Sequence, residues 1–463
     1  MDPAPVAPPR AAWLGPAAVA YLVVVLAIAL AGARPLGHDE AVYALGARSL
    51  LAHEPALPLH RSIGMVVLDL PGVWLGGSEL AVRLPFAVIA LGYLALLYRI
   101  ARRGFGADAA ALAVAVQVIN PEFSWRAGEA LSDIPAAACL LAVVAALTTP
   151  RPRPVVAGVA AAAACYVRYA SAPVVAVILA VVLLTHPAAR RATLAAGAVA
   201  LALLVPFFAW SHAATGSMFG VLEESQRMAR RDYPGQGAWF YLRAWPVTLA
   251  GPVAGAVAAV GAAVAVAAWW RRRTDDAGRL GRLLGAVAIG QLGLLGWRVH
   301  GEARFVTLAV TALVAVGAGW LAGGPAWRRR AAVALVVAGA VPSAAWTTIR
   351  VRRLGDERAA IVAAARAIAV DRGDARCVVY ATEAPIAAWY SGCRAQRVDG
   401  WGPDPAAAVG VPRVYLADAV RLRYHATGWI DPTDARFGWR PVPTARPTEA
   451  WAWRATVAIA PSP

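Results

Sequence analysis

The chain has 463 residues, of which 60% are hydrophobic and only 15% are charged. An ordinary soluble domain carries about 25% charged residues, and repeated apolar runs of about 20 residues are long enough to cross a bilayer. These features predict a polytopic membrane protein and exclude an ordinary soluble enzyme. The formal net charge of +17 does not indicate nucleic-acid binding, because no basic patch alternates with stacking aromatic residues on a soluble element.

Residues 1–11 contain several prolines and predict a short cytoplasmic tail. The apolar run that follows is too long for the hydrophobic region of a secretory signal, so we expect an uncleaved first helix. Hydropathy predicts an all-α bundle of about eleven transmembrane helices, each near the length of about 20 residues that a bilayer requires. The predicted spans cover residues 12–33, 80–101, 107–121, 133–149, 155–170, 172–186, 192–212, 247–270, 281–297, 304–322 and 331–349.

Arginine clusters predict the orientation of these spans. Each cluster follows an even-numbered span, so one side of the membrane collects all of them, and the positive-inside rule makes that side the cytoplasm. We therefore expect a multi-pass protein of the plasma (inner) membrane with a cytoplasmic N-terminus. The clusters are Arg99, Arg102 and Arg103; Arg151 and Arg153; Arg190 and Arg191; Arg271 to Arg273; and Arg328 to Arg330. The predicted outward segments are residues 34–79, 121–132, 213–246 and 298–303 and everything after Trp346.

The first outward loop, residues 34–79, carries the sequence HDEAVY directly after the first apolar run. Asp39 and Glu40 therefore lie at the mouth of a membrane helix, where an ionisable group is costly and indicates a functional site. Farther along the loop, residues 65–68 form an apolar segment that is too short to span the bilayer. It predicts an interfacial or re-entrant piece.

After residue 349 the composition changes to that of a soluble domain, so we expect a membrane domain at 12–349 and a small extracytoplasmic α/β domain at 350–463. Residues 356–372 have helical spacing with apolar side chains on one face. Residues 377–380 and 414–416 are typical of short buried strands bounded by turn residues.

The four cysteines divide into two pairs. Cys377 and Cys393 lie on the predicted oxidising side and form either a disulfide or two free buried thiols. Cys139 and Cys165 lie in predicted spans, where we expect them only to pack.

Four motifs follow one another along the chain, on one predicted side of the membrane. They are His38-Asp39-Glu40-Ala41-Val42-Tyr43, Arg83-Leu84-Pro85, Ser132-Asp133-Ile134-Pro135 and Glu302-Ala303-Arg304-Phe305. With this order, residues 12–350 resemble the GT-C superfamily of polytopic glycosyltransferases. The nearest branch is that of the protein O-mannosyltransferases and aminoarabinose transferases.

The resemblance implies transfer of a mannose- or arabinose-like sugar from a polyprenyl-phosphate donor to a glycan, lipid or protein acceptor. The transfer would occur at the outer membrane face, within the domain at 12–349, with residues 34–79 as its catalytic outer loop. Asp39 matches the acidic residue of the family's first outer loop, which implies that it deprotonates the acceptor hydroxyl while the lipid phosphate leaves with inversion. Asp133 matches the family's second acidic position, and the expected partners are the donor, the acceptor and the bilayer, without nucleic acid.

The chemistry calls for the same kinds of residue. A positioned base contributes about 10²–10⁴-fold to a rate, and Arg suits bidentate contact with a leaving phosphate. The outward candidates are Arg61, Arg168 and Arg304. His38 is a further candidate for substrate binding, with the alternative that it is only a polar loop residue.

Each candidate also has a structural interpretation. Asp39 could pair with Arg34 or Arg48 at the membrane interface, and Arg304 could pair with Glu302. Glu40 is a further catalytic candidate, although a structural or acceptor-binding role beside Asp39 is the expected one. Ser132 and Asp133 precede Pro135, the pattern of a helix N-terminus, and that role is compatible with a site role for Asp133.

Two further questions stay open at this point. The seven His and four Cys show no metal-binding spacing, but a divalent cation between Asp39 and Asp133 is not excluded. The main alternative function is a transporter or lipid flippase without glycosyl-transfer activity, which would commonly show two related halves; no internal repeat is visible. The leading hypothesis requires Asp39, Asp133 and at least one of the three arginines to line one outward cavity.

Overall fold

The computed structural model describes residues 14–31, 34–53, 61–228, 232–397, 411–419, 439–445 and 450–455. By its internal contacts the chain divides into two compact units, and neither is one continuous stretch of sequence. The helical unit comprises Met1–Leu30, Leu57–Leu68 and Arg83–Ile349. The C-terminal unit comprises Ala31–Ala56, Asp69–Val82 and Arg350–Pro463. Asp39 therefore belongs to the same unit as the end of the chain.

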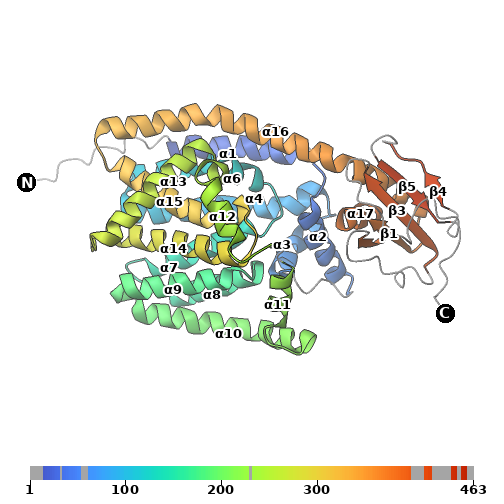
Figure 1. Ribbon diagram of the computed structural model, residues 1–463, viewed down its shortest axis with the longest axis horizontal. Coiled ribbons are helices and arrows are strands. Elements are labelled where there is room, and N and C mark those ends of the chain that lie inside the picture. The colour runs from blue at the N-terminus through green and yellow to red at the C-terminus, as the bar shows by residue number, and fades with distance from the viewer. Residues whose placement is uncertain are drawn as a thin grey trace, which may run out of the picture. The chain divides into compact units, whose positions relative to one another are not determined.

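The helical unit is a bundle in which each of the eleven predicted spans lies on a helix (Figure 1). The elements that lie wholly or partly in this unit are α1 (Leu14–Ala31), α3 (Ile63–Trp74), α4 (Glu79–Phe105), α5 (Ala107–Val118), α6 (Pro121–Arg126), α7 (Asp133–Leu147), α8 (Pro154–Val167), α9 (Ser171–Thr185), η1 (Pro187–Ala189), α10 (Arg190–Thr215), α11 (Gly220–Arg227), α12 (Gln236–Ala244), α13 (Val247–Trp270), α14 (Asp276–Arg298), η2 (Ala303–Val306), α15 (Thr307–Ala322) and α16 (Ala326–Arg372).

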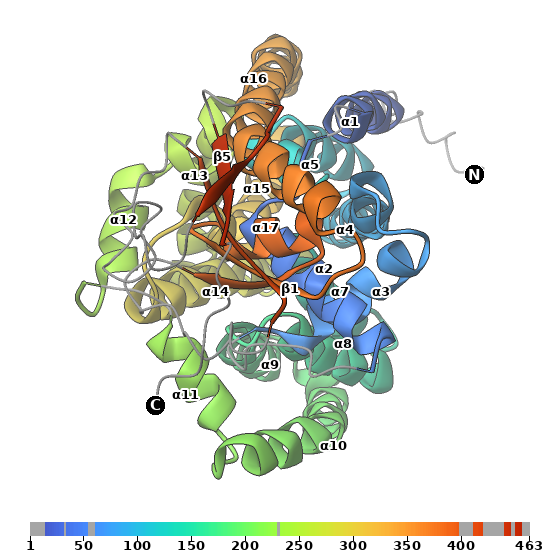
Figure 2. The same ribbon diagram turned by 90° about the vertical axis from the view of Figure 1, so that its right-hand side faces the viewer.

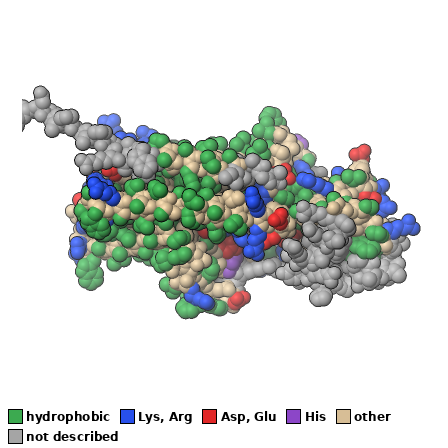
Figure 3. Space-filling model, turned by 90° about the horizontal axis from the view of Figure 1, so that it is seen from above, with side chains coloured by type: hydrophobic (Ala, Val, Ile, Leu, Met, Phe, Trp, Pro, Cys, Tyr) green, Lys and Arg blue, Asp and Glu red, His purple; other side chains and the backbone are tan. Residues whose placement is uncertain are grey.

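Length and apolar surface fit a membrane environment. Within the described part of the chain, six helical segments are long and apolar enough to cross a bilayer, and six shorter apolar helices accompany them. On α10 the side chains of Leu194, Leu201 and Val205 are each at least 60% exposed, an arrangement that suits lipid rather than water. The face in Figure 3 is covered mainly by hydrophobic and uncharged side chains over the helices. The predicted fold class is confirmed.

Small residues let the central helices of this unit approach closely. A Cβ atom added to Gly261 on α13 would lie 1.9 Å from the carbonyl oxygen of Leu313 on α15. A Cβ added to Gly317 on α15 would lie 2.1 Å from the carbonyl oxygen of Val257 on α13. Only glycine fits at such backbone contacts, which are typical of helix pairs in membranes.

The structure refines two of the predicted elements. The predicted last span at 331–349 and the predicted soluble helix at 356–372 are parts of one 47-residue helix, α16. The residues between them include no proline, and the single Gly355 weakens a helix by only about 1 kcal/mol. The apolar segment at 65–68 lies inside α3, which ends at Trp74.

The C-terminal unit combines α2 (His38–Leu51) with a small mixed sheet. Its other elements are β1 (Cys377–Ala381), α17 (Ala384–Ser391), β2 (Arg394–Arg397), β3 (Arg413–Ala419), β4 (Arg440–Val442) and β5 (Ala450–Arg454). The strand order is β2-β1-β3-β5-β4, with β1 parallel to both β2 and β3, and β5 antiparallel to β3 and β4. Helix α17 connects β1 to β2 and lies beside the strands (Figure 2).

The two strands that the sequence predicted form the centre of this sheet. Val378 and Tyr380 of β1 pair in register with Val414 and Leu416 of β3, and all four side chains are buried in one cluster. Continuous burial of β1 explains why its sequence shows an apolar run rather than an alternating pattern.

Candidate functional site

Polar side chains of the helical unit converge at the ends of three helices. Asp133 is the first residue of α7, and Arg168 follows the last residue of α8 in an extended conformation. Arg304 lies in η2, the short turn before α15. All three side chains line one pocket, and a guanidinium nitrogen of Arg168 donates a hydrogen bond to the carboxylate of Asp133.

The second arginine of this pocket is also paired. Arg304 forms an ion pair with Glu302, and His300 Nε2 lies 2.8 Å from the other carboxylate oxygen of Glu302. Burial alone would raise the pKa of Glu302, but the hydrogen bond with His300 and the charge of Arg304 outweigh it and lower that pKa to about 2. Glu302 is therefore ionised at every physiological pH, and the structural pairing that the sequence suggested for Arg304 is present.

An aromatic ring joins the two arginines. The guanidinium carbon of Arg168 lies 4.5 Å from the ring centroid of Phe305, and that of Arg304 lies 5.2 Å from the same centroid. Gln291 fixes the segment, because its Nε2 donates to the carbonyl of Phe305 at 3.0 Å and its Oε1 accepts from the backbone N–H of Ala309 at 2.7 Å. Two cations are thus held against one ring.

The pocket between these side chains holds about 10 Å³, which is room for about one water molecule. A phosphate group enters only if the ion pairs open. Exchange of a carboxylate partner for a phosphate is chemically reasonable for Arg, because both anions accept the same bidentate geometry.

Arg61 is held near this pocket through its backbone. Tyr169, the residue after Arg168, donates its hydroxyl hydrogen to the carbonyl of Arg61 at 2.9 Å. Gly64 permits the approach, because a Cβ there would lie 2.6 Å from the backbone of Tyr166. The structure therefore brings the chain at Arg61 to the end of α8, although Arg61 is not among the residues that line the pocket.

In the C-terminal unit, the motif HDEAVY forms the start of α2. Asp39 is the second residue of this helix and is half-buried. Glu40 is only 1% exposed, accepts from the backbone N–H of Gly37 at 2.7 Å and lies 3.3 Å from Nη1 of Arg358. Glu40 therefore caps the helix and contacts α16, and these contacts support a structural role for Glu40. The N-terminal end of the helix favours a negative charge at Asp39.

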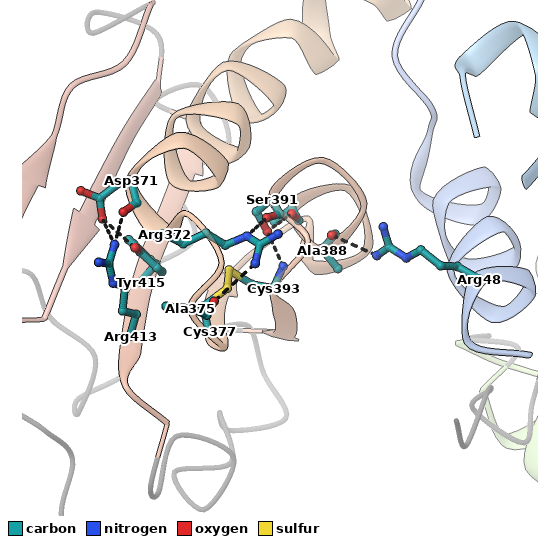
Figure 4. The surroundings of a disulfide bond; sticks show 11 residues. Arg48, Asp371, Arg372, Ala375, Cys377, Ala388, Ser391, Cys393, Arg413 and Tyr415 are labelled. Atoms are coloured by element: carbon teal, nitrogen blue, oxygen red, sulfur yellow. Dashed lines mark hydrogen bonds and ion pairs between the residues drawn. A yellow bond between two sulfur atoms is a disulfide. The ribbon is translucent and has the colours of Figure 1, made fainter. Parts of the chain in front are cut away.

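Helix α17 makes a second set of contacts with the same segment. His38 Nδ1 lies 2.8 Å from Glu383 Oε2, and the hydroxyl of Tyr390 accepts from the backbone N–H of Leu36 at 2.9 Å. Arg48, on the next turns of α2, donates to the carbonyl of Ala388 at 3.4 Å, as Figure 4 shows. The start of α2 is thus held on both sides of Asp39 by residues more than 300 positions away in the sequence.

A disulfide between Cys377 and Cys393 encloses α17 in a short covalent loop (Figure 4). Arg372 of α16 donates to the carbonyls of Ser391 and Ala375, on both sides of this loop. Of the two alternatives for these cysteines, the structure contains the disulfide. Cys139 and Cys165 are free thiols.

One acidic residue that sequence reasoning missed is Asp69 of α3. It has no exposed surface, and neither carboxylate oxygen has a hydrogen-bond partner within the described residues. Burial raises the pKa of Asp69 well above its usual value, and the nearby charge of Glu40 raises it further. The signal in the sequence was a lone acid inside an otherwise apolar segment, Met65 to Leu70.

We expect a substitution of Asp69 to change how stability depends on pH. Below the unfolded-state pKa of Asp69, about 3.9, its carboxyl group is protonated in both the folded protein and the unfolded chain, so burial of the group costs no charge-related stability there. Above that pH the unfolded chain loses the proton while the folded protein keeps it. Stability is lost as pH rises from there through the folded pKa. Asp69→Asn should therefore raise the thermal unfolding midpoint of purified protein above neutral pH and flatten its pH dependence. The exposed Asp374→Asn is the control, and equal pH slopes in wild type and Asp69→Asn would contradict the expectation.

The candidates from the sequence thus fall into two groups. Asp133, Arg168 and Arg304 share one pocket, and the carbonyl of Arg61 accepts a hydrogen bond from Tyr169, the residue after Arg168. Asp39, Glu40 and His38 belong to the C-terminal unit, so a cavity shared with Asp133 stays a prediction. The sequence did not predict that Arg168 contacts Asp133 and Phe305, or that Glu40 pairs with Arg358 and His38 with Glu383. No local pattern links residues so far apart in the sequence.

The structure also bears on the predicted cation site and on the aromatic residues of the C-terminal unit. Within the described ranges, no three or more His, Cys, Asp or Glu side chains gather as ligands would, so a cation between Asp39 and Asp133 stays a hypothesis. Trp389 and Tyr390 contact residues of α2 and α4 inside their own unit. Trp401 and Trp429, which the sequence suggests for acceptor binding or an aromatic core, lie outside the described residues.

Comparisons with known proteins bear on the fold of the chain. Residues 72–210 match the family model of dolichyl-phosphate-mannose-protein mannosyltransferases, whereas a search of curated protein sequences finds no significant match. The fold is similar to ArnT from Cupriavidus metallidurans bound to undecaprenyl phosphate, with a TM-score of 0.68, 16% identity, and coverage of 98% of this chain and 100% of that chain. ArnT in the apo state gives a TM-score of 0.67 at 17% identity, with 97% and 99% covered.

A more distant similarity extends to an archaeal enzyme. The oligosaccharyltransferase of Archaeoglobus fulgidus in complex with Zn and sulfate matches with a TM-score of 0.54 at 15% identity, over 81% of this chain and 62% of that chain. At these identities the solved structures establish the fold alone.

Proposed function

We propose that the chain is a membrane glycosyltransferase of the GT-C type that moves a mannose- or arabinose-like sugar from a polyprenyl-phosphate donor to an extracytoplasmic acceptor. The match of residues 72–210 to the family model of dolichyl-phosphate-mannose-protein mannosyltransferases and the similarity of the fold to that of ArnT bound to undecaprenyl phosphate support this proposal. The observation that carries the proposal is the convergence of Arg168 and Arg304 on Phe305 in one pocket. Two guanidinium groups held in place can neutralise the phosphate that leaves an anomeric carbon.

In the proposed reaction the acceptor hydroxyl oxygen attacks the anomeric carbon of the donor. The bond from that carbon to the phosphate oxygen breaks, and the electron pair stays on the polyprenyl phosphate. Asp39 takes the hydroxyl proton as general base, and attack opposite to the leaving group inverts the anomeric centre. Arg168 and Arg304 bind the phosphate, whose negative charge rises as the bond breaks.

Asp133 has a positioning role in this proposal. It holds Arg168 through an ion pair until the donor phosphate replaces the carboxylate. Because Asp133 begins α7, its own position is fixed by the helix rather than by the substrate. Glu302 likewise holds Arg304 through an ion pair until the donor phosphate replaces its carboxylate.

The proposed membrane arrangement follows the arginine clusters. The N-terminus and the clusters face the cytoplasm, and the segments with Asp39, Asp133 and Arg304 face the other side of the plasma membrane. A polyprenyl-phosphate sugar would be used from that outer leaflet, and a glycan, lipid or protein would accept the sugar there.

An assay in proteoliposomes distinguishes this function from that of a lipid flippase. Purified protein is given a polyprenyl-phosphate mannose or arabinose with a radiolabelled sugar, together with envelope extract as acceptor. We expect label to move from the lipid into acceptor while polyprenyl phosphate is released in equal amount. Movement of intact donor between leaflets without release of polyprenyl phosphate would contradict the proposal and favour the transporter alternative.

We further propose that α17 holds α2 in the position that catalysis needs, with Glu383 as a positioning residue that acts through His38. Glu383→Gln weakens a hydrogen bond to a charged group, worth about 1.5–3 kcal/mol, so we expect kcat to fall about tenfold with little change in the KM for donor. The control is Glu357→Gln, which removes an exposed carboxylate of the same unit. Equal kcat values for the two variants would contradict the positioning role.

A further inference from the structure

The helical unit contains a second cavity, which shares no lining residue with the pocket of Asp133. It measures about 500 Å³, within the range of about 300–1,000 Å³ that small-molecule sites occupy. Its walls come from the end of α4, the loop between α7 and α8, the start of the segment that contains α10, and the start of α14. All of these lie on the predicted cytoplasmic side, whereas the proposed transfer site lies on the other.

Three basic side chains from three elements line this cavity: Arg103, Arg279 and His186. Arg103 Nη1 donates to the carbonyl of Ala145 at 3.0 Å, and within the described residues its other guanidinium N–H groups make no hydrogen bond. His186 Nδ1 lies 2.8 Å from Thr185 Oγ1, which itself donates to the carbonyl of Val181; Nδ1 is therefore the donor of this pair, Nε2 of the neutral ring is an acceptor, and the binding of an anion rests on the two arginines. A guanidinium fixed by one nitrogen and open at the others is well suited to an anion.

A helix start adds to the positive potential. Pro187–Thr215 form one helical segment, and its first turn, residues 187–189, lines the cavity. That turn begins with proline and contains no acidic residue. Pro187 has no N–H and the Ala189 N–H donates to the carbonyl of His186 at 2.9 Å, so the Ala188 N–H and the positive end of the helix dipole are what this turn offers to an anion.

One carboxylate also lines the cavity, that of Asp276. It forms an ion pair with Arg279, with Nη2 and Oδ1 2.6 Å apart. The Asp276 side chain is 83% exposed, so this pair stands in water, where ion pairs contribute little. An incoming anion can therefore replace Asp276 at small cost.

We propose that this cavity binds a phosphate-ester anion between Arg103, Arg279 and the helix start at Pro187. A phosphate ester supplies the acceptor oxygens that two guanidinium groups and the backbone N–H of Ala188 require. On the predicted cytoplasmic face such a group could come from an anionic lipid head group or from a soluble phosphorylated metabolite. The site is independent of glycosyl transfer, so failure of either proposal leaves the other intact.

Binding is measured as the shift in thermal unfolding midpoint of full-length protein. One arm titrates glycerol 3-phosphate in detergent, and the other uses phosphatidylglycerol in phosphatidylcholine nanodiscs. We expect a saturable rise in midpoint for wild type and a loss of affinity of about tenfold or more for Arg103→Gln/Arg279→Gln. The control Arg271→Gln/Arg330→Gln removes two exposed arginines that do not line the cavity, and it should bind as wild type does.

A third variant, Ala188→Trp, fills the cavity while it keeps every charge, and it should also lose binding. A response to both ligands assigns the phosphate group itself, and a response to the lipid alone assigns a lipid head group. The proposal is overturned if neither ligand binds, if Ala188→Trp keeps full affinity, or if the control pair loses as much affinity as the cavity pair.

Discussion

Asp39→Asn should lower the rate of sugar transfer by about 10²–10⁴-fold, the usual contribution of a positioned general base. The substitution keeps the size of the side chain and removes its ability to take a proton. Asp39 occupies the first turn of α2 and is half-buried, and Asn fills the same space there. Transfer is measured in proteoliposomes as labelled sugar that leaves the polyprenyl-phosphate donor.

Two variants make this result interpretable. Asp374→Asn makes the same chemical change at an exposed position of the same unit and should transfer sugar at the wild-type rate. Asp39→Glu keeps the base but lengthens the side chain, and it should recover part of the lost rate. Wild-type transfer by Asp39→Asn would show that another group accepts the proton.

Arg168→Ala should weaken binding of polyprenyl phosphate by about 10- to 100-fold. The estimate follows from hydrogen bonds to charged groups, worth about 1.5–3 kcal/mol, and from about 1.4 kcal/mol for each factor of ten in affinity. Arg168→Lys keeps the charge but loses the bidentate geometry, so its affinity for polyprenyl phosphate should lie between that of the wild type and that of Arg168→Ala. Binding is measured from the quenching of intrinsic Trp fluorescence by added polyprenyl phosphate.

Loss of stability could imitate this loss of binding. Arg168→Ala leaves the carboxylate of Asp133, whose side chain is only 3% exposed, without its partner, and removal of one member of a buried pair costs about 3–5 kcal/mol. The double variant Asp133→Asn/Arg168→Ala removes that unpaired charge and should regain thermal stability without regaining affinity. Recovery of affinity in the double variant would mean that Arg168 acts only by keeping the fold intact.

Much of the fold followed from local patterns in the sequence. The bilayer imposes a length on every apolar segment, and the arginine clusters mark the ends of alternate spans, so all eleven predicted spans lie on helices. In the C-terminal unit, the apolar runs at 377–380 and 414–416 predicted the two central strands because both are buried. Asp133 was placed correctly at a helix start by its neighbours Ser132 and Pro135.

The pairings of the site were decided by tertiary structure alone. Arg168 meets Asp133 because α8 ends where α7 begins, and Glu383 meets His38 across 345 positions of sequence. Hydrophobic period and composition describe the surroundings of a residue along the chain, whereas these contacts depend on how helices pack. The sequence by itself determined the membrane class, the order of the helices and the acidic candidates. Only the packing decided which cation each acid binds, and that Asp69 is buried without a hydrogen-bond partner among the described residues.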